Sequence, residues 1–383
     1  MPRANETDGY LKTALYLAVF ILVYGAILAY YAFSLPPALD ENGALDRIKR
    51  SPTAFDTPDD YFYAIDHPAL FHWVDRAILA ALRVPIGDIP KLNLNESYDW
   101  NVEHGRIAPR RPVNVLRAAN VVTLAAALLM LFFLARFLFG GYIWGFVVAA
   151  PLAIPTTLGT GVGGYIKSDA HLAFFFALTL YLWVRFHYAA RPTTFLRVII
   201  MGIVIGLAIS AKLNAGLLFL AYLAYLVITA RGVDKAWVSL VFALTAFTVF
   251  VAVNPVLQRG GLEGALAAIA DMFRQRQRTY ELHRQWFGTM TAADRILFMF
   301  PQWYLLAIFA LVVAHARRER WFLPVILWSS FLIIGTALTV EQRFERYLMP
   351  IDFGLGVAVA FSATAIFRRL RDGQVRLIDL LKG

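Results

Sequence analysis

The sequence has no cysteine among its 383 residues, and only 16% of its residues are charged. The lack of cysteine excludes disulfide bonds and thiolate metal sites, and it leaves the redox compartment undetermined. The low share of charge stands beside 59% hydrophobic residues. Because a soluble globular domain carries more charge and less apolar surface than this, we predict an all-α polytopic membrane protein.

Basic residues outnumber acidic ones, with 36 Lys and Arg against 26 Asp and Glu and a formal net charge of +10. In a soluble protein this excess would suggest a nucleic-acid partner. Here the cations cluster at the ends of apolar runs, which is the distribution that orients membrane helices. We therefore predict no nucleic-acid partner.

Apolar runs fill most of the chain, and several approach the twenty or so residues that cross roughly 30 Å of hydrocarbon. About ten transmembrane helices are predicted, over residues 11–35, 113–139, 142–158, 170–186, 198–211, 213–230, 237–257, 296–315, 321–340 and 348–367. Cations precede the first run and follow the last. We therefore expect both termini in the cytoplasm of a bacterium, with the chain in the inner membrane.

Two polar stretches interrupt what is otherwise a single membrane-embedded domain, 1–383. Residues 36–112 form a first outer loop, and its acidic character makes it the presumed active site on the periplasmic side. Within it, residues 61–84 repeat apolar side chains at helical spacing and predict an amphipathic helix. The second outer loop, 258–295, mixes arginines with aromatics. It suits either an interfacial helix or a surface helix packed on the membrane domain.

Short motifs occur in a fixed order between Leu11 and about Phe367. They are Asp40-Glu41 after the first run, Asp66-His67-Pro68-Ala69-Leu70 in the same loop, Lys167-Ser168-Asp169 opening a span, the stretch 206–212 ending at Lys212, and Arg346-Tyr347-Leu348-Met349-Pro350 opening the last span. This ordered set resembles the GT-C glycosyltransferases, in the branch of protein O-mannosyltransferases and aminoarabinose transferases. Ala69 stands where that family has a second proline, a difference that bears on the acceptor.

The resemblance implies a GT-C-like helix bundle whose outer loop bears amphipathic helices. It also implies a transferase that takes a sugar from a polyprenyl-phosphate-linked donor on the outer face of the membrane. The acceptor is a lipid, a glycan or a protein, and membrane lipid is a further partner. No cofactor is certain, and a divalent metal stays open.

Catalysis of this kind needs a carboxylate that takes the proton of the acceptor. The candidates are Asp40, Glu41, Asp59 and Asp60. Asp40 is the first choice because it directly follows the first span, although a solvated loop carboxylate is the alternative. Glu41 then shares a metal or orients the acceptor. Asp59 and Asp60 follow a proline and suit the start of a helix, so capping is favoured there over catalysis.

Substrate binding needs cations that stabilise the leaving phosphate. The predicted substrate-binding residues include three cations and also acids, a histidine and a tyrosine. They are Asp66, His67, Asp169, Lys212, Arg343, Arg346 and Tyr347. Structural alternatives exist for several of them: His67 and Pro68 can shape a turn where the loop helix meets the membrane, and Asp169 can cap a helix. Lys212 can extend to the interface instead of meeting a lipid phosphate. The two arginines can pair with neighbouring glutamates instead of a phosphate.

A membrane transporter or lipid flippase without covalent chemistry is the alternative function. Such proteins place ionisable residues near the middle of the membrane and often contain internal repeats. Here the charges lie at the ends of spans and in the outer loop, and the second half does not repeat the first. The pattern therefore favours an enzyme over a transporter, and over a non-catalytic assembly partner.

Overall fold

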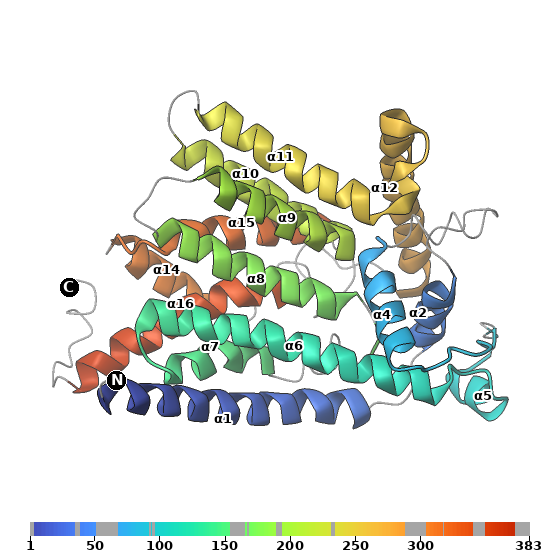
Figure 1. Ribbon diagram of the computed structural model, residues 1–383, viewed down its shortest axis with the longest axis horizontal. Helices are drawn as coiled ribbons and strands as arrows, with labels where there is room; N and C mark the ends of the chain where they lie inside the picture. The colour runs from blue at the N-terminus through green and yellow to red at the C-terminus, as the bar shows by residue number, and fades with distance from the viewer. Residues whose placement is uncertain are drawn as a thin grey trace.

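The computed structural model of the chain is drawn in Figure 1. It describes residues 4–34, 39–50, 68–91, 93, 96–153, 165–166, 168–188, 194–230, 234–287, 304–316, 318–339 and 349–371. Throughout these ranges the regular structure is helical, without a strand. The predicted all-α class is therefore confirmed.

Each of the ten predicted spans coincides with a helix in the described ranges. These helices are α1 (Ala4–Ser34), α6 (Arg110–Phe139), α7 (Ile143–Ala153), α8 (Asp169–Tyr188), α9 (Phe195–Ala211), α10 (Gly216–Thr229), α11 (Asp234–Val253), α14 (Tyr304–Ala316), α15 (Phe322–Thr339) and α16 (Met349–Arg371). By length and composition, α1, α6, α8 and α11 can each cross a membrane, while α9, α10, α15 and α16 hold shorter apolar segments. The chain is thus an integral, multi-pass membrane protein.

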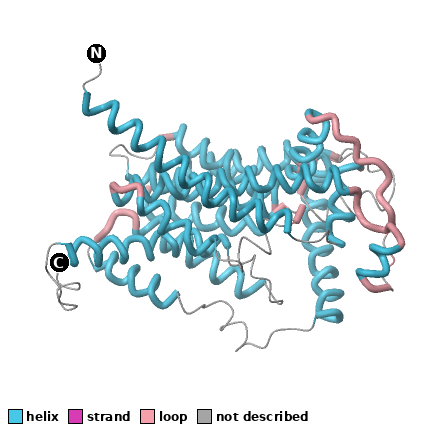
Figure 2. The backbone as a smooth tube through the Cα atoms, turned by 90° about the horizontal axis from the view of Figure 1, so that it is seen from below, coloured by secondary structure: helices cyan, strands magenta, loops and turns pink. Residues whose placement is uncertain are grey.

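The membrane helices lie side by side in one bundle, and the remaining helices lie at one end of it (Figures 1 and 2). Helix α1 begins and α16 ends at the opposite end. The remaining helices are α2 (Leu39–Lys49), α4 (Leu70–Ala81), α5 (Tyr98–Glu103) and α12 (Gly261–Phe287). We call the end that carries them the loop end. Both predicted outer loops therefore contribute helices to the same end of the bundle.

Aromatic side chains form much of the core inside the bundle. The rings of Trp183 and Tyr222 meet edge to face with centroids 5.2 Å apart, and Trp328 packs against Phe176 at 5.5 Å. All four side chains are at most 1% exposed. Contacts of this kind add to the gain from burial, so they fix α8 against α10 and α15.

Two glycines allow α9 to approach α11 closely. A Cβ atom at Gly206 would lie 2.7 Å from the carbonyl oxygen of Ala246, and one at Gly202 would lie 2.8 Å from Thr245 Cβ. Small residues four apart are a common way for membrane helices to pack backbone against backbone. The loop-end termini of α9 and α11 are thereby held next to each other, with Lys212 directly after α9.

The loop end has a small apolar core of its own. It is formed by Ala44, Leu45, Ile48, Phe71, Leu79, Val84, Ala108, Val113, Leu116 and Ile166. Helix α4 confirms the predicted helix over part of residues 61–84. Its buried face, however, carries Phe71 and Leu79, whereas Trp73 and Leu82 of the predicted apolar stripe are 37% and 59% exposed.

Helix α12 has two apolar sides with different surroundings. Ala265 and Met272 pack against Leu257 at the end of the bundle, which agrees with a surface helix packed on the membrane domain. Leu262 and Phe273 are 66% and 61% exposed. Exposed apolar side chains beside a membrane suit an interfacial helix. Packing on the membrane domain and lying in the interface are therefore both compatible with α12.

Candidate functional site

A buried ion pair joins α8 to the residue that follows α9. Lys212 Nζ lies 2.5 Å from Asp169 Oδ1, and the two side chains are 10% and 4% exposed. Sequence analysis selected both residues for separate reasons, and the fold brings them together from 43 positions apart. Because Ala211 ends α9 just before Lys212, the ammonium group lies where the bundle meets the loop end.

A second buried ion pair holds α2 on α6. Arg117 donates from Nε to Glu41 Oε1 and from Nη2 to Oε2, each at 2.8 Å. Arg117 Nη1 also donates to the carbonyl oxygen of Ala32 at 2.9 Å, and the amide of Ile166 donates to Glu41 Oε1 at 3.3 Å. Glu41 is fully buried. This bidentate pair fixes how the chain leaves α1 and starts α2.

Asn42 ties the first outer loop together. Its side chain donates to the carbonyl oxygens of Pro90 and Arg106 at 3.1 and 3.2 Å, and its Oδ1 accepts from the amide of Ala108 at 2.8 Å. One amide side chain thus satisfies three main-chain groups, one at Pro90 and two in the segment 106–108. Glu41 and Asn42 together anchor the first turns of α2.

A third polar contact joins α4 to α8. Asp75 Oδ1 lies 3.6 Å from His171 Nε2, with side chains 1% and 7% exposed. Burial raises the pKa of the Asp75 carboxyl well above its ordinary value, because an apolar environment disfavours the charged form. The contact lies on the side of α4 that faces the bundle.

The start of α4 is also linked to the end of α11. Asn254 Oδ1 accepts from the amide of Ala69 at 2.7 Å, and Asn254 Nδ2 donates to Ser210 Oγ at 3.1 Å. Asn254 is 1% exposed. This side chain therefore joins the first outer loop to the termini of α9 and α11.

Several predicted site residues lie outside the described residues. They are Asp59, Asp60, Asp66, His67, Arg343, Arg346 and Tyr347. The main chain of Asp40 is described and lies in the first turn of α2, at the loop end. Glu41, Asp169 and Lys212 are the predicted residues whose side chains are placed, and all three are buried in ion pairs. Their roles in substrate binding or catalysis stay predictions.

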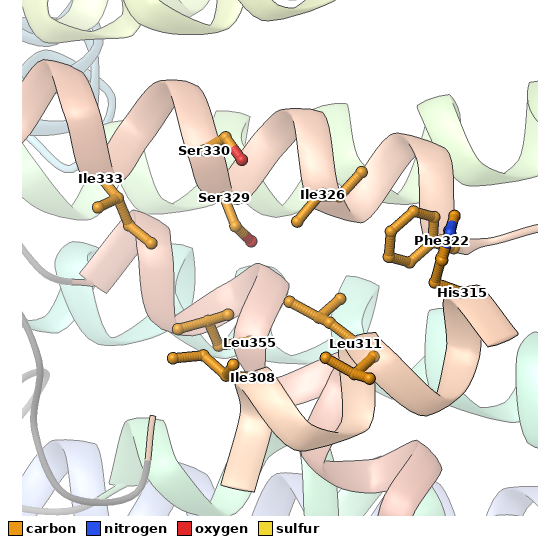
Figure 3. Close-up of a pocket in the computed structure, with 10 residues that line it drawn as sticks. Ile308, Leu311, His315, Phe322, Ile326, Ser329, Ser330, Ile333 and Leu355 are labelled. Carbon is orange, nitrogen blue, oxygen red and sulfur yellow. The ribbon is translucent and has the colours of Figure 1, made fainter. Parts of the chain in front are cut away.

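Across the described ranges, no group of three or more His, Asp or Glu residues is close enough to hold a metal ion. The apolar cavity shown in Figure 3 lies between α14, α15 and α16 and has a volume of about 440 Å³. Its lining is Ile308, Leu311, Val312, His315, Phe322, Ile326, Ser329, Ser330, Ile333 and Leu355. This lining has no Asp, Glu, Lys or Arg, so the charged pairs of the loop end are the better candidate site for a phosphate.

Sequence analysis did not select Arg117, Asp75, His171 or Asn254. A signal existed for Arg117, which falls inside the predicted span 113–139, because an ionisable residue within a membrane span is a functional candidate by default. The same signal applies to His171 in the span 170–186. Asp75 has a weaker one, as an acid on the amphipathic helix of the outer loop.

Comparison with known proteins finds a family match for part of the chain and structural matches for nearly all of it. The sequence profile of the family described as dolichyl-phosphate-mannose-protein mannosyltransferase matches residues 111–257. This segment includes Arg117, Asp169, Lys212 and Asn254, and it starts after the first outer loop. No curated protein matches the chain by sequence.

Two solved structures share the fold over almost the whole chain. The crystal structure of ArnT from Cupriavidus metallidurans, bound to undecaprenyl phosphate, has a TM-score of 0.56 at 13% identity and covers 94% of this chain. The oligosaccharyltransferase of Archaeoglobus fulgidus, crystallised with zinc and sulfate, has a TM-score of 0.50 at 14% identity and covers 93%. The chain spans 63% of ArnT and 50% of the oligosaccharyltransferase. The chain therefore has the same fold as these two proteins.

Proposed function

We propose that the chain is a GT-C-type glycosyltransferase that moves a sugar from a polyprenyl-phosphate-linked donor to an acceptor. The observation that carries this proposal is the buried pair of Asp169 and Lys212 at the loop end. Both residues lie within the segment that matches the mannosyltransferase family. ArnT, which shares the fold, was crystallised with undecaprenyl phosphate, a lipid of the class that the proposed reaction releases.

Lys212 acts on the phosphate of the donor. An ammonium group has three N–H donors, so it can hold a carboxylate and a phosphate oxygen together. As the bond between the sugar and the phosphate breaks, negative charge grows on the departing polyprenyl phosphate. A lysine in a site with little water stabilises that charge more strongly than it could in solution. Asp169 fixes the position of the ammonium group.

Asp40 takes the proton from the acceptor hydroxyl or amine, whose oxygen or nitrogen forms the new bond to the anomeric carbon. Its position in the first turn of α2, next to the buried Glu41, supports this role. Glu41 positions that turn through Arg117 and does not take the proton itself, because Arg117 and the amide of Ile166 donate to its oxygens.

The loop end faces the periplasm, and α1 begins and α16 ends on the cytoplasmic side. The chain is one membrane-embedded domain, with the site formed by the first outer loop, 36–112, above the membrane helices. A phosphatase that is active only after export, fused after Lys382, should be inactive, whereas a cytoplasmic reporter should be active. Strong export activity there would contradict this orientation.

The test of function is transfer by purified protein in liposomes. A panel of polyprenyl-phosphate sugars is supplied with lipid, glycan and peptide acceptors, and the products are identified by mass spectrometry. We expect a sugar-bearing acceptor and free polyprenyl phosphate in equal amounts. Movement of a labelled solute or lipid across the membrane without any covalent product would contradict the proposal and favour a transporter or flippase.

A further inference from the structure

An acidic residue lies in the middle of the buried face of α4. Phe71, Asp75 and Leu79 follow one another at intervals of four residues, and each is at most 2% exposed. Helical periodicity thus gives Asp75 a position that normally holds an apolar side chain. Neither of its oxygens has a hydrogen-bond partner among the described residues. Burying a carboxyl group in this way is costly, so apolar packing alone does not explain it.

The polar group that faces Asp75 is the imidazole of His171. His171 is 5% exposed, and neither of its ring nitrogens has a hydrogen-bond partner within the described ranges. The 3.6 Å between His171 Nε2 and Asp75 Oδ1 exceeds the length of a hydrogen bond. A movement of about 1 Å brings the two atoms into hydrogen-bond range. Each buried group can therefore satisfy the other.

His171 belongs to the same helical turn as Asp169. Side chains two positions apart project to different sides of a helix. Asp169 accordingly meets Lys212, at the end of α9, while His171 meets Asp75, on α4. The first turn of α8 is thus held from two sides, and one of the two contacts comes from the outer loop.

We propose that Asp75 and His171 are a positioning pair for the transferase site: protonated Asp75 donates its O–H to Nε2 of a neutral His171. The bond fixes the first turn of α8, and Asp169 with it, against α4. This inference rests on the proposed function. Burial favours the protonated carboxyl of Asp75, and His171 then carries its own proton on Nδ1.

Two substitutions of Asp75 separate positioning from packing. Asp75→Asn replaces the O–H donor with an amide N–H, so transfer should stay close to the wild-type rate. Asp75→Leu removes the donor and suits the apolar face of α4, but it leaves Nε2 of His171 without its partner, so the unfolding temperature should fall modestly while the protein stays folded. Its kcat should nevertheless fall about 10- to 100-fold, with little change in the KM for the donor, because Asp169 is misplaced. Asp88→Asn, which removes an exposed acid from the same loop, is the matched control and should behave as wild type.

Three outcomes would overturn the inference. Full activity of Asp75→Leu would show that the pair has no role in transfer. A loss of kcat in proportion to the loss of folded protein would reduce the pair to a structural contact. An Asp75→Asn variant as impaired as Asp75→Leu would show that the site needs a charged carboxylate instead of a hydrogen-bond donor.

A measurement that does not depend on transfer separates this inference from the proposed function. In protein labelled with ¹⁵N-histidine, the His171 signals are identified by their loss in His171→Phe. We expect a neutral ring that is protonated on Nδ1 in wild type and in Asp75→Asn. A doubly protonated ring, or a proton on Nε2, would refute the pair as described. The expected signals in a protein that transfers no sugar would support the pair and refute the proposed function.

Discussion

Replacing Glu41 by Gln tests whether this residue holds the site together or takes part in the chemistry. The change keeps the shape of the side chain and one acceptor for Arg117 Nε, but it removes the negative charge. Arg117 is 3% exposed, so its positive charge would stay buried without its counter-ion. Removing one member of a buried ion pair typically costs about 3–5 kcal/mol.

We expect a loss near the lower end of that range, about 3 kcal/mol, because Arg117 can still donate two hydrogen bonds: one to the Gln carbonyl oxygen and one to the carbonyl oxygen of Ala32. A loss of this size changes the unfolding equilibrium on the order of 100-fold. The assay is unfolding of the purified protein by SDS in mixed micelles, followed by tryptophan fluorescence. The double variant Glu41→Gln with Arg117→Met removes both charges and should recover most of the loss.

Transfer measured on the same preparations decides the role of Glu41. If Glu41 only positions α2, the stable double variant should retain most of the activity. A double variant that unfolds like wild type but has lost transfer by about 10²–10⁴ would show that the pair is needed for transfer beyond its contribution to stability. Wild-type stability of Glu41→Gln alone would refute the reasoning about the buried pair.

Three further predictions concern the other acidic and basic groups. Lys212→Ala should weaken donor binding about 10- to 100-fold, as expected for one lost charge-assisted hydrogen bond, and binding of a radiolabelled donor will show this. Asp40→Asn should lower turnover at saturating donor by about 10²–10⁴ while donor binding survives. Asp59→Asn should cost only the stability of a helix cap. Normal turnover in Asp40→Asn together with lost turnover in Asp59→Asn would move the base to Asp59. Asp75 has a raised pKa, so the native protein holds a proton that the unfolded chain releases above the ordinary value of 3.8. The contribution of this protonated carboxyl to stability is complete below that pH and is lost as pH rises through the native pKa. The unfolding temperature of wild type should therefore fall relative to that of Asp75→Asn as the buffer is made more alkaline.

The membrane helices could be predicted from the sequence because each apolar run is a local feature. Even the two short runs on either side of Lys212 correspond to α9 and α10. The buried face of α4 was harder to predict. Trp73 and Leu82 fit the apolar spacing, but the adjacent α2 and α6 cover Phe71 and Leu79 instead. Which side of an amphipathic helix is covered depends on its neighbours in space, and the sequence period alone does not specify them.

The candidate site could be predicted in part, residue by residue. Glu41, Asp169 and Lys212 were selected because of their places in motifs and at span ends. Their partnerships depend on tertiary contacts: Arg117 lies 76 positions from Glu41, and Lys212 lies 43 positions from Asp169. His171 was missed because a purely apolar stretch, 172–178, follows it directly. Its contact with Asp75 depends on α4 lying beside α8, which the sequence does not specify.

The hydrogen bond between Ala69 and Asn254 has a consequence for biosynthesis. The two residues are 185 positions apart, so at about 5–20 residues per second the ribosome makes the second roughly 10–40 s after the first. The pairing of Glu41 with Arg117 needs only 76 positions and is available much earlier. For much of translation, the start of α4 therefore waits at the membrane surface without its partner from α11. In a chain arrested before Asn254, the start of α4 should be exposed to added protease. In the full-length chain it should be protected.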